Sequence, residues 1–486
     1  MSIFSTSALV FAAALSPVNS SGDAPTSEAT LEGPSTTPAP VSSIALDDSQ
    51  PWRLQTALGL PDWLKLHGFQ RTRWESLGKQ IRAGQSGGIH GLFLRTLLEA
   101  SVQHEGFRVT GEIIDSRAYS INETEPLNTG IINAAELLQG YVAWTNADVV
   151  EEGDTLDLQF GRHTMDVGSR RFVARNRYRN TINQFTGLNA KWDGNDGSSV
   201  RAFAVRPVRR LPTDQPGLQD NDTEFDDELE ETHFFGLHGS MPIHEGNGAA
   251  EAYAFYLDED DQGTINTRDR QLWTIGARVV KKAAKEEFHY EWESAYQFGD
   301  SRATSGAADT TDLDHSAQFH HLIVGYQFDA KMKPQLEGLF DYASGDSDPT
   351  DGDNNRFDTL FGARRFEYGP TGVFGPFARS NILTPGLRLK LTPHQGTKVM
   401  LATRLHYLAS DRDAWTTSGL VDPAGNSGRF IGQFAEVRVR HDIVPKSLQL
   451  EVGFARLFAG GFIDNAPNAT TQGNTNYAYG ALTFTF

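Results

Sequence analysis

The feature that most constrains this chain is an alternation of apolar and polar side chains that recurs in about eighteen segments. In residues 288–299, FHYEWESAYQFG, the side chains of Phe288 and Trp292 fall on one parity. Glu291 and Glu293 fall on the other parity. Because successive side chains of a strand point to opposite faces, one face of such a strand is aromatic and the other charged. The pattern predicts β-strands with one face against an apolar medium, either a protein core or lipid.

The lengths of these segments and of their connections favour lipid. The segments run about nine to fifteen residues, whereas a soluble strand usually has five or six and a tilted membrane strand needs about nine to eleven. Short connections, such as residues 193–197 and 394–396, alternate with long ones, such as residues 163–181 and 346–382. Short turns on one rim and long loops on the other are typical of outer-membrane barrels. We therefore predict an all-β protein: a transmembrane antiparallel β-barrel of about 18 strands. A soluble all-β fold is the alternative.

Composition narrows the possibilities further. The chain has 486 residues, a formal net charge of −19 and no cysteine. This length suits two or three soluble domains or one large barrel. No run of about 18 apolar residues occurs, which excludes a helical membrane span. The acidic balance argues against a nucleic-acid partner, and the lack of cysteine excludes disulfides and thiolate chemistry.

Both ends of the chain carry features of an exported protein. Residues 8–15, ALVFAAAL, resemble the apolar core of a signal peptide, although the preceding MSIFSTS has no Lys or Arg. We predict a signal peptide at 1–20, a disordered tether rich in Ser, Thr and Pro at 21–50, and the barrel at 51–486. The chain ends in NYAYGALTFTF, with Leu482, Phe484 and Phe486 on one face. This ending resembles the C-terminal signal of outer-membrane proteins. We expect a bacterial outer-membrane location with periplasmic termini.

If the apolar parity faces lipid, the opposite parity lines a lumen. In WLKLHGFQRTRWE, the outward side chain of Trp74 places Arg71 and Arg73 inward. The same reasoning predicts two sets of pore-lining residues. The basic set is Arg71, Arg73, Arg95, Arg108, Arg388, Lys390, Arg404, Arg438 and Arg440. The acidic set is Glu99, Glu291, Glu293, Asp341 and Glu436.

The loop after the fifth strand is also rich in arginine. Within GRHTMDVGSRRFVARNRYRN, which contains a single acid, we predict four further pore-lining residues: Arg162, Arg171, Arg175 and Arg179. Arginines in a pore with a low-dielectric wall favour anions, and guanidinium pairs with carboxylate through two hydrogen bonds. The alternative is that these arginines pair with lumenal acids and brace a wide barrel. Parity alone does not separate the two roles.

Two motifs resemble a known family. Residues 158–192, LQFGRHTMDVGSRRFVARNRYRNTINQFTGLNAKW, combine a strand ending in Gly-Arg with Gly-Ser-x-Arg, Arg-Asn and Phe-x-Gly. Residues 342–361, YASGDSDPTDGDNNRFDTLF, place Ser-Gly-Asp before Asn-x-Phe-Asp-x-Leu-Phe. These motifs are similar to those of the alginate export porins, and the resemblance covers nearly the whole chain after residue 51. Where that family often has Tyr-Tyr-Gly, this chain has RRFEYGP, so we expect the long loop to differ in shape.

The resemblance implies an 18-stranded outer-membrane barrel whose electropositive constriction passes an anionic polysaccharide out of the cell. By motif match, it identifies Arg162, Arg171 and Arg179 as candidate pore-lining residues, and Asp346 and Phe357 as loop-motif positions. We therefore expect export of a uronate-type, alginate-like polymer. Expected partners are that polymer, outer-membrane lipid, lipopolysaccharide and periplasmic export proteins. An uptake porin for small anionic solutes is the alternative.

Other chemistry has weaker support in the sequence. Four acids could hold Ca²⁺ through oxygen ligands: Asp346, Asp348, Asp351 and Asp353. Their spacing departs from the EF-hand because Asp351 stands where glycine is needed, and a solvated acidic loop is the alternative. We expect no other cofactor. A hydrolase barrel would need a nucleophile beside a histidine. No such motif accompanies His289 or His406, so we expect no enzyme.

Overall fold

The computed structural model describes residues 53–121 and 126–486. The predicted signal peptide and tether, residues 1–20 and 21–50, lie outside the described residues. Within the described part, no helix is long and apolar enough to cross a membrane. The long strands are β1 (Leu64–Leu77), β2 (Ile89–His104), β3 (Phe107–Tyr119), β4 (Asn133–Ala147), β5 (Thr155–His163), β6 (Phe185–Asp193), β7 (Ser199–Arg209), β9 (Thr232–Ile243), β10 (Gly248–Glu259), β11 (Gln271–Lys281), β12 (Phe288–Ser301), β13 (Leu313–Gln327), β14 (Gln335–Ala343), β16 (Ile382–His394), β17 (Thr397–Tyr407), β18 (Phe430–Val444), β19 (Leu448–Ala459) and β20 (Thr475–Thr485).

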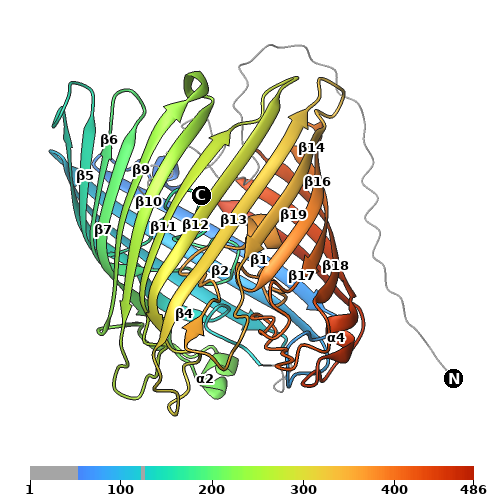
Figure 1. Cartoon of the computed structure of the whole chain (residues 1–486). Coiled ribbons are helices and arrows are strands. Elements are labelled where there is room, and N and C mark those ends of the chain that lie inside the picture. The colour runs from blue at the N-terminus through green and yellow to red at the C-terminus, as the bar shows by residue number, and fades with distance from the viewer. Residues whose placement is uncertain (1–52, 122–125) are drawn as a thin grey trace. The chain divides into compact units, whose positions relative to one another are not determined.

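These 18 strands form one closed antiparallel barrel (Figure 1). Each strand pairs with its neighbours along the chain, and β1 pairs with β20 from Phe69↔Thr485 to Leu77↔Tyr477. Closure leaves no sheet edge, so every backbone group of the wall has a partner without water. The predicted barrel is confirmed.

The connections alternate between short turns on one rim and long loops on the other, as predicted. Figure 1 shows α2 (Gln215–Asp220) and α4 (Gly461–Asn465) together at the long-loop rim. The short elements α3 (Arg365–Tyr368), β8 (Asp227–Glu228) and β15 (Asp353–Asn354) also lie in long loops. The remaining short elements are α1 (Leu54–Ala57), before β1, and η1 (His244–Gly246), in the turn between β9 and β10.

The outer face of the wall is apolar. On β12, Trp292 is 44% exposed, whereas Glu291 is 4% and Glu293 0% exposed. In the strand register, Trp292 lies between Val279 and Leu322, so apolar side chains continue around the outside. The aromatic parity of residues 288–299 therefore faces lipid, and the charged parity faces inward.

Toward the long-loop rim, two loops fold into the bore, and the interior there contains packed apolar side chains. Residues 164–184 and 344–381 meet through a backbone bridge between Val173 and Phe361. The Phe172 ring packs against Phe319 and Phe357, with 5.8 Å between ring centroids in each pair. Inward positions near this rim are thus part of a buried aromatic core. This core holds the loops that carry the candidate site.

A charge on the outer face should destabilise the barrel. We expect Leu322→Arg, opposite Trp292 and Phe340 in the register, to lower the free energy of unfolding by about 2–4 kcal/mol, because the guanidinium enters hydrocarbon. Urea unfolding in lipid vesicles measures the change. The control Val150→Arg, at a turn residue that is 69% exposed, should leave stability nearly unchanged. Equal effects of the two substitutions would contradict the assignment of the outer face.

Candidate functional site

Three inward arginines hold the loop of residues 164–184 by its backbone. The Nη groups of Arg71 donate to the carbonyl oxygens of residues 177, 178 and 179 at 2.9–3.1 Å. Arg95 donates to the carbonyls of residues 177 and 179 at 2.9 Å, and Arg73 donates to that of residue 178 at 2.6 Å. Hydrogen bonds from a charged donor are stronger than neutral ones. The loop is therefore fixed against β1 and β2.

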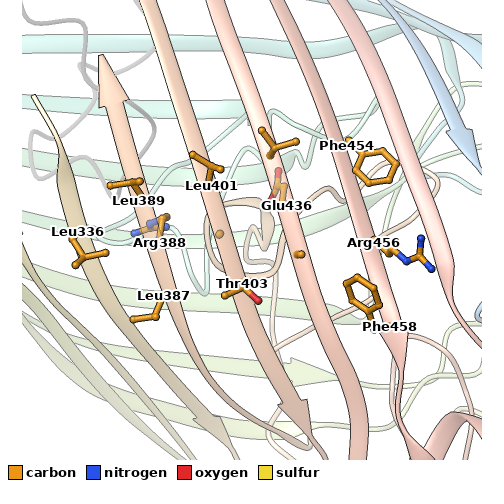
Figure 2. A pocket seen from close by; sticks show the side chains of 13 residues that line it. Leu336, Leu387, Arg388, Leu389, Leu401, Thr403, Glu436, Phe454, Arg456 and Phe458 are labelled. Carbon is orange, nitrogen blue, oxygen red and sulfur yellow. The ribbon is translucent and has the colours of Figure 1, made fainter. Parts of the chain in front are cut away.

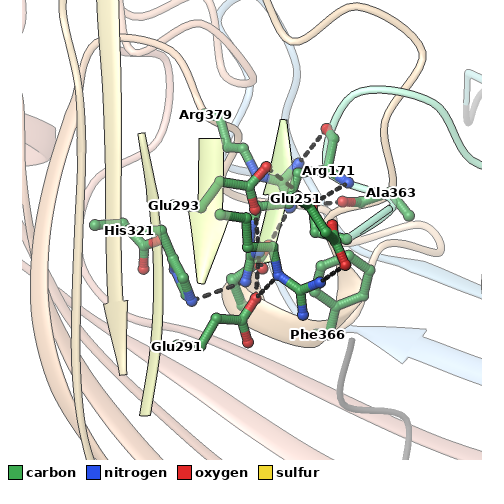
Figure 3. A network of polar contacts seen from close by, with 12 residues as sticks. Arg171, Glu251, Glu291, Glu293, His321, Ala363, Phe366 and Arg379 are labelled. Atoms are coloured by element: carbon green, nitrogen blue, oxygen red, sulfur yellow. Dashed lines mark hydrogen bonds and ion pairs between the residues drawn. The ribbon is translucent and has the colours of Figure 1, made fainter. Parts of the chain in front are cut away.

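The same loop inserts Arg171 into a buried cluster of acids (Figure 3). Its Nη1 donates to Glu291 at 2.6 Å and to Glu293 at 2.5 Å, and its Nε lies 2.7 Å from Glu367 of the second inner loop. Burial alone would lower the pKa of Arg171, but these three carboxylates raise the pKa well above its ordinary value. A buried charge needs this degree of compensation. Arg171 therefore joins both inner loops to β12.

A histidine extends this network across the wall. Arg171 Nη2 donates to His321 Nε2 at 2.7 Å, and His321 Nδ1 lies 2.6 Å from Asp341. Because arginine has only donors, His321 accepts through Nε2 and donates from Nδ1 to Asp341. Asp341 also accepts from Arg404 at 2.5 Å. The chain of contacts links the loop to β13, β14 and β17.

Most other predicted residues also face inward, and most of the basic ones pair with acids. Arg438 lies 3.8 Å from the sulfur of Met400, and Glu99 is half-buried beside Glu112 in the register. The ion pairs are Arg108–Asp157 (3.1 Å), Arg175–Glu112 (2.6 Å), Arg388–Glu337, Lys390–Glu337 (2.8 Å), Arg440–Glu451 and Arg365–Glu436 (2.6 Å). These ion pairs correspond to the alternative role, in which the arginines pair with lumenal acids and brace the barrel.

Two predicted pore-lining positions need correction. Arg162 shares the outward parity of Phe160, which is 62% exposed. It pairs with Glu136 at 3.0 Å and Glu228 at 2.7 Å. The prediction that Arg162 faces the lumen is wrong, because the motif match did not take account of strand parity. Arg171 lies inside the barrel, but its side chain has no exposed surface, so it is enclosed rather than lining open space.

The long-loop rim contains a cavity of about 700 Å³ that six long loops line. Five arginines contribute to it: Arg179, Arg210, Arg268, Arg356 and Arg364. Arg268 pairs with Asp358 at 3.4 Å, and Arg356 pairs with Asp413. Among the described residues, Arg179, Arg210 and Arg364 have no carboxylate within 4.0 Å. Three guanidinium groups of one cavity thus have no counter-ion from the described part of the chain.

The neutral contacts of these three arginines compensate their charge poorly. Arg179 donates to the side-chain oxygen of Asn183, Arg210 Nε donates to a backbone carbonyl at 2.7 Å, and Arg364 Nη1 donates to another at 3.1 Å. Burial, followed by repulsion from Arg210 and Arg364, lowers the pKa of Arg179 well below its ordinary value. Burial and two other arginines lower the pKa of Arg364 to about 10. A bound anion would relieve this repulsion.

Of these three arginines, the sequence identified only Arg179. Arg210 and Arg364 lie in long loops that have no periodicity, and nothing in the sequence indicates that these loops turn into the bore. Strand parity could have found Arg278, which is buried between Glu291 at 2.8 Å and Glu251 at 2.7 Å. The wall was therefore more predictable than the loops.

The proposed calcium ligands do not converge. Among the described residues, no group of three or more His, Asp or Glu side chains is arranged to hold a metal ion. Asp348 accepts from Thr350 within its own loop, and Asp351 accepts from the backbone N–H of Asp353 at 2.9 Å.

A closed 18-stranded barrel with an apolar exterior, a charged interior and inward-folded loops defines the protein as an outer-membrane porin. Comparison with known proteins specifies the family. The sequence profile described as alginate export matches residues 63–476, and the chain belongs to this family. No curated protein matches the chain in sequence.

Solved structures show the same fold at low sequence identity. Pseudomonas aeruginosa OccD3 (OpdP) is 12% identical, with a TM-score of 0.55, covering 88% of this chain and 92% of that chain. Acinetobacter baumannii OccAB3 is 12% identical, with a TM-score of 0.56 and coverage of 87% and 99%. A BenF-like porin from Pseudomonas fluorescens Pf-5 is 9% identical, with a TM-score of 0.57 and coverage of 87% and 99%.

Removal of Arg171 should release the inner loops. We expect Arg171→Gln to lower the free energy of unfolding by about 3–5 kcal/mol, because it leaves buried acids without a counter-charge. Limited proteolysis should then cut within residues 164–184, and urea unfolding should show the loss of stability. Arg177→Gln is a matched control in the same loop, since its side chain is 53% exposed and forms one ion pair at 3.2 Å. If both variants resist protease like the parent, the network does not hold the loop.

Proposed function

We propose that this porin exports an anionic, uronate-type polysaccharide. The observation that carries the proposal is the set of three guanidinium groups, Arg179, Arg210 and Arg364, that share one cavity without a carboxylate partner among the described residues. A carboxylate that enters the cavity would supply the missing counter-charge through paired hydrogen bonds. Membership of the alginate export family supports a polymer as the cargo.

The cavity also suits a carbohydrate chain. Hydroxyl groups line it beside the arginines, from Thr304, Ser305, Ser380, Thr416 and Thr417. Hydroxyl and guanidinium groups together can bind the hydroxyls and carboxylate of a uronate unit. Arg179 is held in place because its own carbonyl accepts hydrogen bonds from Arg71 and Arg95. A fixed donor loses little entropy when the anion binds.

The assignment of the two rims supports the proposed direction of transport. We assign the short turns to the periplasm, because outer-membrane barrels have short periplasmic turns and long external loops. Phe486, whose backbone N–H donates to Gly68 at 2.9 Å, then lies on the periplasmic side. The arginine cavity stands at the external mouth, where an exported polymer would leave.

Uptake of small anions is the second candidate. Pseudomonas aeruginosa OccK2 (OpdF) in complex with glucuronate has this fold, with 10% identity and a TM-score of 0.52. The two inner loops, residues 164–184 and 344–381, fold into the bore of this chain and line the arginine cavity. This cavity suits a single sugar acid as well as a threaded chain. Chain-length dependence of binding separates the two functions.

The three unmatched arginines should set anion preference. We expect the combined Arg179→Gln, Arg210→Gln and Arg364→Gln variant to lose most of the chloride-over-potassium preference of the parent in planar bilayers, because the positive field at the mouth disappears. Reversal potentials in a salt gradient measure it. Arg206→Gln, an exposed position outside the lumen, should keep the parent value. A cation-selective parent, or an unchanged triple variant, would contradict the assignment.

Length dependence of block should distinguish a polymer from a solute. We expect oligomers of a uronate added on the long-loop side to dwell longer in the pore as their length increases, because successive carboxylates rebind at high effective concentration. Single-channel current records give the dwell times. The triple variant should lose the length dependence. If the monomer blocks the parent channel and longer oligomers do not, uptake of small anions is the function.

A further inference from the structure

The apolar outer wall of the barrel contains a groove. It has a volume of about 460 Å³ and runs from β14 across to β19 (Figure 2). Leucines such as Leu387 form one side, and Phe454 and Phe458 form the other. Between them, Thr403 and Ala435 are neighbours in the register and provide a floor of small side chains. A groove of this volume has room for about one acyl chain, which would lie along the outer wall.

One end of this groove carries a cation, Arg456. It shares the outward parity of Phe454 and Phe458, which are 45% and 41% exposed. Its guanidinium lies 4.8 Å from the centre of the Phe458 ring. Its Nε is buried and has no hydrogen-bond acceptor in the described structure. Figure 2 shows the Arg456 side chain at the margin of the groove, beside both rings.

Of the other outward arginines, Arg206 lies outside the groove and contacts His233 at 3.4 Å, and two are neutralised by the protein. Arg117 lies 2.8 Å from Asp115, and Arg162 contacts two glutamates. Arg456 has no carboxylate within 4.0 Å among the described residues. A guanidinium on a lipid-facing wall is costly unless an anion pairs with it or it reaches the interface. The missing counter-charge must therefore come from the surroundings.

The depth of Arg456 along the barrel wall indicates which part of the membrane supplies the counter-charge. It stands three residues before the end of β19 at Ala459, about 10 Å along the strand from the long-loop rim. That depth corresponds to the headgroup region of the leaflet on the loop side, which our assignment of the rims makes the outer leaflet. Acyl chains beside a phosphate at this level are the chemistry of the phosphorylated glycolipid anchor of lipopolysaccharide.

We propose that this groove is a binding site for that glycolipid, with one acyl chain against Leu387, Phe454 and the small floor residues and one phosphate on Arg456. The site is separate from the arginine cavity in the lumen. Its ligand is a membrane component rather than the transported cargo. Phosphate pairs with guanidinium through two hydrogen bonds, as carboxylate does. The site would hold one lipid against the β16–β19 region of the wall.

Native mass spectrometry of the detergent-solubilised barrel, titrated with purified lipid A, tests the site. We expect lipid A with two phosphates to bind the parent about tenfold more tightly than its dephosphorylated form, the effect of one hydrogen-bonded charge pair. Arg456→Gln should reduce this ratio to about one, whereas Arg206→Gln, on the outer wall but outside the groove, should keep it. Heat-dependent gel mobility verifies that each variant is folded.

A second variant tests the apolar half of the site. Ala435→Trp should fill the floor and weaken binding of both lipid A forms, while the ratio between them stays above one. Phosphatidylglycerol is the competing source of phosphate. Equal affinity of the parent for phosphatidylglycerol and lipid A would overturn the proposed ligand. An Arg456→Gln ratio equal to that of the parent would overturn the site itself, as would a native dimer that excludes lipid from this face.

Discussion

Closure of β1 on β20 is the constraint on which the rest of the structure depends. Hydrocarbon offers no hydrogen-bond partner to a free backbone group, so a sheet in lipid must have no edge. Once the sheet is closed, each strand has one face in lipid and one in the bore. Alternation in the sequence is the consequence of this geometry. The same geometry forces charged side chains such as Glu291 and Glu293 into the interior, where they need partners.

The available partners divide the interior arginines into three groups. Arg71 and Arg95 donate to carbonyls of the loop, and Arg171 and Arg404 contact buried acids. Arg73 does both, since it also pairs with Glu75 at 2.5 Å. The third group has no carboxylate partner among the described residues. The first two groups stabilise the inner loops, since removal of either partner would leave a buried group unsatisfied. The third group is free to meet a ligand. Arginine therefore has two roles in this interior. It stabilises the loops where a carbonyl or an acid lies opposite, and it can bind an anion where neither does.

Much of the fold could be predicted because a period of two residues is a local property. The faces of the strand to which Trp292 and Glu293 point can be predicted from neighbouring residues alone. The partner of an inward residue is not local. Arg171 contacts Glu367 because two long loops pack together inside the bore, and no sequence pattern predicts this packing. Inward Phe319 and Phe434 also break the polar-inside rule, since the loops convert that part of the lumen into a protein core.

The placement of acids and arginines near the mouth gives a physical reason for the overall charge of −19. Several acids lie exposed on long loops around the mouth, among them Asp222, Glu224, Glu230 and Asp353, while unmatched guanidiniums lie in the cavity beneath. A negative rim repels an anion that approaches from outside, and this repulsion slows capture at low ionic strength. A polyanion that arrives through the bore meets the positive cavity first and the negative rim afterward. This order of charges assists release of an anion to the outside more than its capture, and it is consistent with the proposed export of a negatively charged polymer.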